Sequence, residues 1–311
     1  MKIVLFGSSD FSIPTLQTLD KSSHDLISVV TPIDKPRGRG KKVIISNFRK
    51  EINALSYPNL QFENFNLDET VKTLQKINAD LFVVVAFQKL PDKIINIPKY
   101  GCVNIHPSKL PKYRGSSPIQ YAILNGDKEI GISIIKISSK IDSGNILFQS
   151  NLAISDNENF GDIYYKSSVI GADNLIKTIN LLNKNIAYRG IIQDDSNATY
   201  AKKLFAKDFK INWNKTSLEI YNQIRAFSPY PGAYSFLNKK RFKIFKSKII
   251  LEKNMNLNLP AGSIKIEDNS IYVKTKDNFL SLLILQIEGK KKMDVASYLK
   301  GNNLNCFNFD E

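Results

Sequence analysis

The sequence contains few of the residues that build metal centres and disulfide frameworks. Only two of its 311 residues are cysteine and two are histidine. Two thiols cannot form a disulfide framework or a thiolate zinc site, and two imidazoles exclude a metal site built on several histidines. We therefore expect no metal cofactor. The four residues are Cys102, Cys306, His24 and His106.

Long apolar runs are missing as well. No stretch approaches the roughly 18 residues that a membrane-spanning helix needs. The apolar run at residues 1–7 is too short for a signal peptide and is not followed by a cleavage site of small residues, so it is more typical of a buried first strand. These features predict a cytoplasmic protein without membrane association.

Glycine-rich phosphate-binding motifs are also absent. Gly7, at the end of the first expected strand, is a lone glycine. The sequence contains neither G-x-G-x-x-G nor a P-loop. A site for a dinucleotide or a nucleoside triphosphate therefore has little support.

Positive charge is what the sequence has in excess. Its 44 Lys and Arg residues against 29 Asp and Glu residues give a net charge of +15, and 42% hydrophobic residues suffice for packed cores. Residues 35–50 carry seven basic side chains and no acidic one, and residues 207–311 hold 18 basic against 10 acidic side chains. Separate basic clusters in two parts of the chain suit a long anion such as a nucleic acid.

The order of the expected elements predicts two domains. Strands at 2–7, 26–30, 81–86, 102–106 and 131–138 alternate with helices at 13–19, 71–77 and 163–182, which predicts an α/β, Rossmann-like, mostly parallel sheet in residues 1–190. A polar linker is expected at 191–206. Beyond it, a helix at 217–225 and short alternating strands at 233–237, 242–250, 262–266, 271–275 and 279–285 predict a smaller OB-like β-barrel in residues 207–311.

Three polar residues form a candidate catalytic group. Asn104 and His106 are two apart on the strand expected at 102–106, so both side chains face one side near its carboxyl end, where sites of open α/β sheets gather. An imidazole can transfer protons, and an amide can stabilise an oxyanion. Asp142, in a tight turn, can orient or stabilise the imidazole. Taken singly, the histidine could be structural and the aspartate a turn cap.

The motifs around these residues resemble the folate-dependent formyltransferase family. That family carries Asn-x-His, Ser-Leu-Leu-Pro, Arg-Gly-x-x-Pro and Leu-Asp-x-Gly, which appear here as Asn104/His106, Ser108–Pro111, Arg114–Pro118 and Ile141–Gly144. The resemblance implies 10-formyltetrahydrofolate as the donor and Asn104, His106 and Asp142 as the catalytic group.

The same resemblance implies which residues line the folate site. They are Ser108, Lys109, Leu110, Pro111, Phe87, Gln88, Lys89 and Leu90. Lys109 stands where leucine is usual, and Gln88-Lys89 replaces a more apolar pair. Both departures could alter the contacts with folate, although contacts made through the backbone would tolerate them.

The acceptor of the formyl group must be inferred from other segments. Some members of the family act on methionyl-tRNA and meet the acceptor end of initiator tRNA with a basic loop, which residues 31–42 resemble. Residues 200–204 resemble the linker of these members, and residues 225–233 and 285–293 resemble their barrel. The resemblance thus implies initiator methionyl-tRNA as the partner and a monomeric enzyme. The expected tRNA-binding residues are Arg37, Arg39, Lys41, Lys42, Lys240 and Arg241.

Two other hypotheses remain open. A glycinamide nucleotide, a nucleotide-linked amino sugar or water could be the acceptor instead, but a basic loop has little purpose for a small acceptor. An RNA-binding protein without activity would require a broken catalytic group. We further expect His24 to lie in a surface turn and Trp213, the only tryptophan, to pack between the domains.

Overall fold

The computed structural model describes residues 1–34, 36–37, 42–43, 45–251, 258–302 and 308–309. The chain divides into two compact units. The first comprises Met1–Pro118, Glu129–Ala153 and Tyr164–Ala201, and the second comprises Ile119–Lys128, Ile154–Ile163 and Lys202–Glu311. Each unit is therefore built from several segments of the chain. The domain boundaries expected at 190 and 206 stay a prediction.

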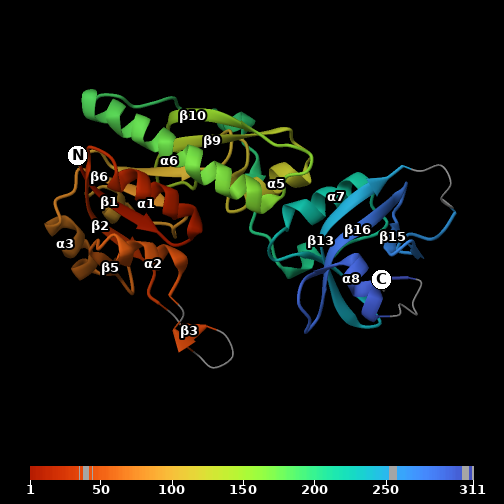
Figure 1. The fold of residues 1–311 in the computed structure, drawn as a ribbon. Coiled ribbons are helices and arrows are strands. Elements are labelled where there is room, and N and C mark those ends of the chain that lie inside the picture. Colours follow the sequence, from red (N-terminus) through yellow and green to blue (C-terminus); the bar gives the residue numbers. More distant parts are fainter. Residues whose placement is uncertain (35, 38–41, 44, 252–257, 303–307, 310–311) are drawn as a thin grey trace. The chain divides into compact units, whose positions relative to one another are not determined.

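A seven-stranded sheet forms the centre of the first unit, with the order β10-β9-β7-β6-β1-β2-β5 (Figure 1). The strands are β1 (Lys2–Gly7), β2 (Asp25–Thr31), β5 (Asn59–Gln61), β6 (Leu81–Val85), β7 (Cys102–His106), β9 (Glu129–Lys136) and β10 (Ile146–Ala153). The five from β7 to β5 are parallel, whereas β9 pairs antiparallel with both β7 and β10. The predicted mostly parallel sheet is confirmed.

Strand β6 lies at the centre of the sheet, in the core of the first unit. All five residues of β6 are buried, as expected for a strand covered on both faces. Phe6 of β1 packs on Phe82 of β6, with ring centroids 5.1 Å apart. Because β1 and β7 each pair parallel with β6, the carboxyl ends of the three strands meet at one edge of the sheet.

Helices cover the sheet of the first unit. They are α1 (Ile13–Asp20), α2 (Asn47–Ala54), α3 (Asp68–Lys76), α4 (Asp92–Ile95) and the larger part of α6 (Phe160–Lys184). Gly171 lets α6 approach β7, because a Cβ there would lie 2.6 Å from Cγ2 of Ile105. Two-residue strands form two further pairs, β3 (Pro36–Arg37) with β4 (Lys42–Val43) and β8 (Arg114–Gly115) with β11 (Tyr200–Ala201).

The second unit contains an antiparallel sheet with the order β12-β13-β16-β15-β14, and β17 pairs with β16. Its elements are α5 (Pro118–Leu124), α7 (Ser217–Ala226), β12 (Ala233–Leu237), β13 (Lys240–Ile250), β14 (Ile264–Glu267), β15 (Ser270–Lys274), β16 (Phe279–Ile287), β17 (Met293–Asp294) and α8 (Val295–Gly301). A short 3₁₀ turn at Ala206–Phe209 also belongs to this unit, whereas those at Asp10–Ser12 and Asp195–Asn197 belong to the first. The predicted fold class, an α/β unit followed by an antiparallel β unit, is confirmed.

Two sequence-based predictions about single residues were wrong. Trp213 packs inside the second unit, where its Nε1 donates to Oγ of Ser235 at 3.1 Å and its ring stacks on Phe309. His24 is buried, and its Nε2 lies 3.0 Å from Oδ1 of Asn180 on α6. Burial lowers the pKa of His24 below its ordinary value.

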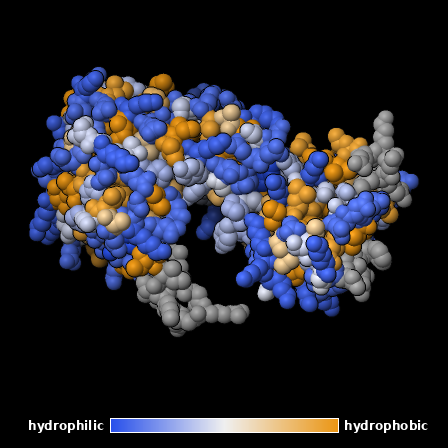
Figure 2. Space-filling model, viewed as in Figure 1, coloured by the Kyte–Doolittle hydropathy of each residue, from blue (hydrophilic) through white to orange (hydrophobic). Residues whose placement is uncertain are grey.

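Apolar residues are scattered over the visible face of each unit as small orange areas among blue ones (Figure 2). Single exposed apolar side chains of this kind are normal for a globular surface. Among the helices that the structure describes, none is long and apolar enough to cross a membrane.

Candidate active site

Strand β7 presents the first two candidate catalytic residues. Asn104 aligns with Val84 of β6, and His106 aligns with Ser133 of β9. His106 is buried, with 5% of its surface exposed, whereas Asn104 is half-buried. Within the described ranges the side-chain amide of Asn104 makes no hydrogen bond, so it is available to a ligand.

The structure brings Asp142 to His106 from the loop between β9 and β10. Oδ2 of Asp142 lies 3.7 Å from Nδ1 of His106, and the two side chains are only 14% and 6% exposed. The same oxygen accepts a hydrogen bond of 2.8 Å from the backbone N–H of Gly115. Asp142 has a φ of 51°, a left-handed conformation that aspartate tolerates better than most residues.

The other ring nitrogen of His106 fixes the tautomer of the imidazole. Nε2 lies 3.0 Å from the backbone oxygen of Tyr113. Because a carbonyl oxygen can only accept, Nε2 must donate. In the neutral ring Nδ1 is then unprotonated and faces Asp142. His106 can therefore take up a proton at Nδ1, beside a carboxylate.

The loop at residues 108–111 is held on β9 by its own backbone. Oγ of Ser133 donates to the Ser108 carbonyl at 2.6 Å and accepts from the Leu110 amide at 3.3 Å. Ser108 and Leu110 are buried, and the peptide bond from Leu110 to Pro111 is cis. Lys109 points outward, with its Nζ 3.6 Å from Oε1 of Glu129.

The second segment expected at the folate site follows β6. Phe87 packs against Phe6 and Leu90 is buried, whereas Gln88 and Lys89 are exposed. Ala86, with a φ of 48°, accepts a hydrogen bond from Oγ of Ser8 through its carbonyl oxygen.

The backbone of this segment is open to a ligand. No backbone group of residues 87–90 bonds to another backbone group in the part of the chain that the structure describes. Such groups can pair with the polar edge of a heterocycle such as a pterin, so the segment fits folate through its backbone. The loop at residues 108–111 differs in this respect, because the carbonyl oxygens of all four of its residues accept hydrogen bonds within the protein.

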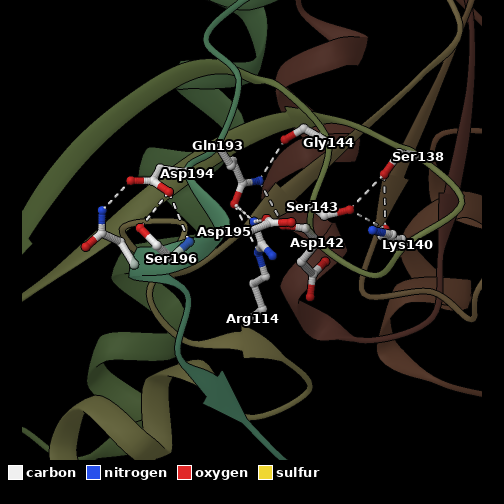
Figure 3. A network of polar contacts seen from close by, with 11 residues as sticks. Arg114, Ser138, Lys140, Asp142, Ser143, Gly144, Gln193, Asp194, Asp195 and Ser196 are labelled. Carbon is white, nitrogen blue, oxygen red and sulfur yellow. Dashed lines mark hydrogen bonds and ion pairs between the residues drawn. The ribbon is translucent and has the colours of Figure 1, made fainter.

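A network that the sequence analysis missed surrounds the Asp142 loop (Figure 3). The buried Arg114 guanidinium donates to Oε1 of Gln193 from Nε at 3.1 Å and from a terminal nitrogen at 2.8 Å, and to Oδ1 of Asp195 at 2.7 Å. Nε2 of Gln193 donates to the carbonyl oxygens of Asp142 at 2.8 Å and Gly144 at 2.7 Å. Gln193 and Asp195 lie in the segment expected to be a linker, and no sequence signal pairs them with Arg114.

The expected tRNA-binding residues are placed only in part. Arg39 and Lys41 lie outside the described residues, and of Arg37 and Lys42 only the backbone, in β3 and β4, is described. Lys240 is exposed at the start of β13. The guanidinium of Arg241 lies over the ring of Tyr234, 4.8 Å from its centroid.

Comparison with known proteins places the chain in a family. Residues 1–179 match the family model described as formyl transferase, and residues 203–303 match the formyl transferase C-terminal domain. The chain belongs to the formyltransferase family. This formyl-group transferase is 36% identical to a methionyl-tRNA formyltransferase of Syntrophomonas wolfei, covering 98% of the chain and 96% of the relative. It is 37% identical to the Staphylococcus aureus enzyme of that name, covering 96% of each chain.

Solved structures share the fold. WlaRD, a sugar 3N-formyltransferase solved in the presence of dTDP and 5-N-formyl-THF, superposes with a TM-score of 0.65 at 26% identity, covering 94% of this formyltransferase and 99% of that chain. The methionyl-tRNA formyltransferase of Clostridium thermocellum superposes with a TM-score of 0.57 at 18% identity, covering 92% and 98%. Within the described residues, no group of three or more His, Cys, Asp or Glu side chains could hold a metal ion.

Proposed function

We propose that this formyltransferase transfers the formyl group of 10-formyltetrahydrofolate to the amino group of methionyl-initiator-tRNA, for translation initiation in the cytoplasm. The pairing of His106 with Asp142 beside the unpaired amide of Asn104 is the observation that carries the proposed chemistry. The named relatives over nearly the full length of the chain support the acceptor.

The three catalytic residues have separate roles in this proposal. Nδ1 of His106 takes the proton that the amine loses as it attacks and returns it to the tetrahydrofolate nitrogen as the bond between that nitrogen and the formyl carbon breaks. The hydrogen bond from Nε2 to the Tyr113 carbonyl oxygen holds the ring. The carboxylate of Asp142 stabilises the imidazolium so formed. The amide of Asn104 donates a hydrogen bond to the oxygen on which negative charge develops.

Folate is proposed to bind along residues 86–90 and 108–111. When bound, 10-formyltetrahydrofolate supplies the formyl carbon that the amine attacks. The free backbone groups of residues 87–90 support this placement, because they can pair with the polar edge of the pterin. The side chains of Phe87, Leu90, Ser108 and Leu110 hold these two segments in shape.

The tRNA is proposed to meet basic residues on both units, and the enzyme to act as a monomer. On the second unit, Arg241 stacks on Tyr234 and Lys240 is exposed beside it. An arginine stacked on an aromatic ring can meet phosphates or exposed bases. On the first unit the proposed contacts are Arg37, Arg39, Lys41 and Lys42. These four contacts are inferred from the sequence alone.

A formylation assay tests the function. The purified enzyme and 10-formyltetrahydrofolate are incubated at low salt with methionyl-initiator-tRNA, with other charged tRNAs or with a nucleotide-linked amino sugar. We expect formyl transfer to methionyl-initiator-tRNA and loss of that activity in His106→Ala. Activity on the amino sugar alone would show that the acceptor is a small molecule and would refute the proposal.

A further inference from the structure

Residues 193–201 contact the backbone around both members of the catalytic pair, His106 and Asp142. They belong to the first unit. On one side Gln193 binds the loop that carries Asp142. On the other side Thr199 binds the backbone that contacts His106. We call residues 193–201 the bracing segment.

All hydrogen-bonding groups of the Gln193 side chain are paired, and they lie on the Asp142 side of the catalytic pair. Its oxygen accepts two hydrogen bonds from Arg114, and its amide nitrogen donates one each to the carbonyl oxygens of Asp142 and Gly144 (Figure 3). Gln193 is buried, with 8% of its surface exposed, so these four bonds are shielded from water. A buried amide with every group paired fixes the geometry of what it binds.

Thr199 fixes the backbone on the His106 side of the catalytic pair. Its Oγ1 accepts from the Tyr113 amide at 2.9 Å, and its carbonyl oxygen accepts from the Arg114 amide at 2.8 Å. Strand β11 then pairs parallel with β8, which contains Gly115. The Tyr113 carbonyl that binds Nε2 of His106 and the Gly115 N–H that binds Asp142 are thereby held in place.

From this geometry we propose that Gln193 is a positioning residue for the reaction. It acts through Asp142: by binding the backbone of Asp142 it sets the position of the carboxylate relative to Nδ1 of His106. Arg114 in turn fixes the orientation of the Gln193 amide, because its two donors require the amide oxygen on their side. This inference rests on the proposed catalytic roles of His106 and Asp142.

Gln193→Glu is the sharpest test variant. A glutamate can still accept from Arg114, so the buried guanidinium keeps its partner. It has no donor for the carbonyl oxygens of Asp142 and Gly144 and would repel them. We expect kcat to fall about tenfold or more while KM for tRNA and for folate changes less than about twofold, since misplaced groups slow chemistry more than binding. Gln193→Ala serves as a second variant.

The matched control is Asp194→Ala. Asp194 is the next residue in the chain, and among the described residues its side chain bonds only to Ser196 and Asn197. We expect its kcat to stay within about twofold of the wild type. Equal losses of kcat in Asp194→Ala and Gln193→Glu would show that the bracing segment matters only for stability and would overturn the proposal.

A double-mutant cycle separates positioning from general stability. If Gln193 acts through Asp142, Gln193→Glu should cost little further activity in the Asp142→Asn background. If its role is only structural, the two losses should multiply. Full activity of both Gln193 variants, or a multiplicative loss, would refute the inference.

A readout without catalysis keeps this inference distinct from the proposed function. The chain has two histidines, so the ¹⁵N resonances of the His106 ring can be assigned by comparison with His24→Asn. We expect Gln193→Glu to shift the His106 resonances in the direction that Asp142→Asn does, with those of His24 unmoved. Unmoved His106 resonances would contradict the positioning role even if the enzyme proved to use another acceptor.

Discussion

The backbone N–H of Gly115 donates a hydrogen bond to the same carboxylate oxygen of Asp142 that faces the ring of His106. The oxygen thus has one permanent donor from the backbone and one neighbour that can gain a proton. This arrangement lets the charge of Asp142 and the position of Asp142 be tested separately.

Asp142→Asn tests the charge. Asparagine tolerates the left-handed backbone of position 142 and retains an oxygen for the Gly115 N–H, so the fold should be kept. Without a carboxylate, the protonated ring of His106 loses its stabilisation. We expect kcat to fall at least about 100-fold in steady-state formylation assays, with an unchanged melting temperature. Activity within a few-fold of the wild type would contradict the role of the carboxylate.

Gly115→Ala tests the position. A Cβ there would lie 2.5 Å from the Ala201 carbonyl oxygen, and the φ of 120° is strained for any residue with a side chain. We expect a loss of about 2 kcal/mol or more in the free energy of unfolding, together with a reduced kcat.

The control for this strain is Gly289→Ala. Its φ of 77° is also left-handed, but beyond its two chain neighbours no atom of the described residues lies within 4 Å of the added Cβ. We expect it to lower stability by about 1 kcal/mol and to leave kcat unchanged. A similar loss of kcat in both variants would contradict a specific effect of the pairing between β8 and β11.

Lys109→Leu tests the departure from the family motif. Lys109 is 52% exposed and contacts Glu129, and exposed ion pairs contribute about 0–1 kcal/mol. We expect KM for folate to stay within about twofold. Ser133→Ala should raise that KM severalfold, because it leaves the Ser108 carbonyl and Leu110 amide unpaired and loosens the loop. A large change in Lys109→Leu alone would place its side chain at the folate site.

The expected tRNA contacts of the basic loop are tested with Arg39→Ala combined with Lys41→Ala. Because phosphate contacts dominate affinity for nucleic acids, we expect KM for tRNA to rise far more than KM for folate. The rise should be smaller at high salt, where the contacts of the wild type are already weakened. An equal effect on both KM values would show that this loop does not meet tRNA.

A pH-dependent stability is expected at the start of α7. Hydrogen bonds from the hydroxyl and the backbone N–H of Thr216 lower the pKa of Glu219. The folded state therefore binds fewer protons than the unfolded chain, and the stabilisation is complete above the unfolded pKa of about 4.3 and is lost as the pH falls through the lower folded value. The difference in melting temperature between the wild type and Glu219→Gln should shrink from pH 6 to pH 3. A constant difference would contradict this linkage.

The strands and helices with strong patterns were predictable, and those with weak patterns were not. The apolar run of β6 and the period of α6 predicted both elements, because each buries enough apolar surface to decide its own conformation. β10 and α2 were missed: β10 carries polar residues over much of its length, and α2 has only two buried residues, Phe48 and Ile52. Trp213 was placed wrongly because sequence alone does not show which core an aromatic ring fills.

The sequence by itself determined the chemical groups of this formyltransferase: Asn104 and His106 share a face of β7 because side chains alternate along a strand. Only the tertiary structure decided how Asp142 meets His106 and why it stays there. The residues that hold the pair, Arg114 and Gln193, are far apart in the chain and follow no repeat. Their pairing is set by buried donors and acceptors that must all find partners, which is a property of the folded protein and not of any local pattern.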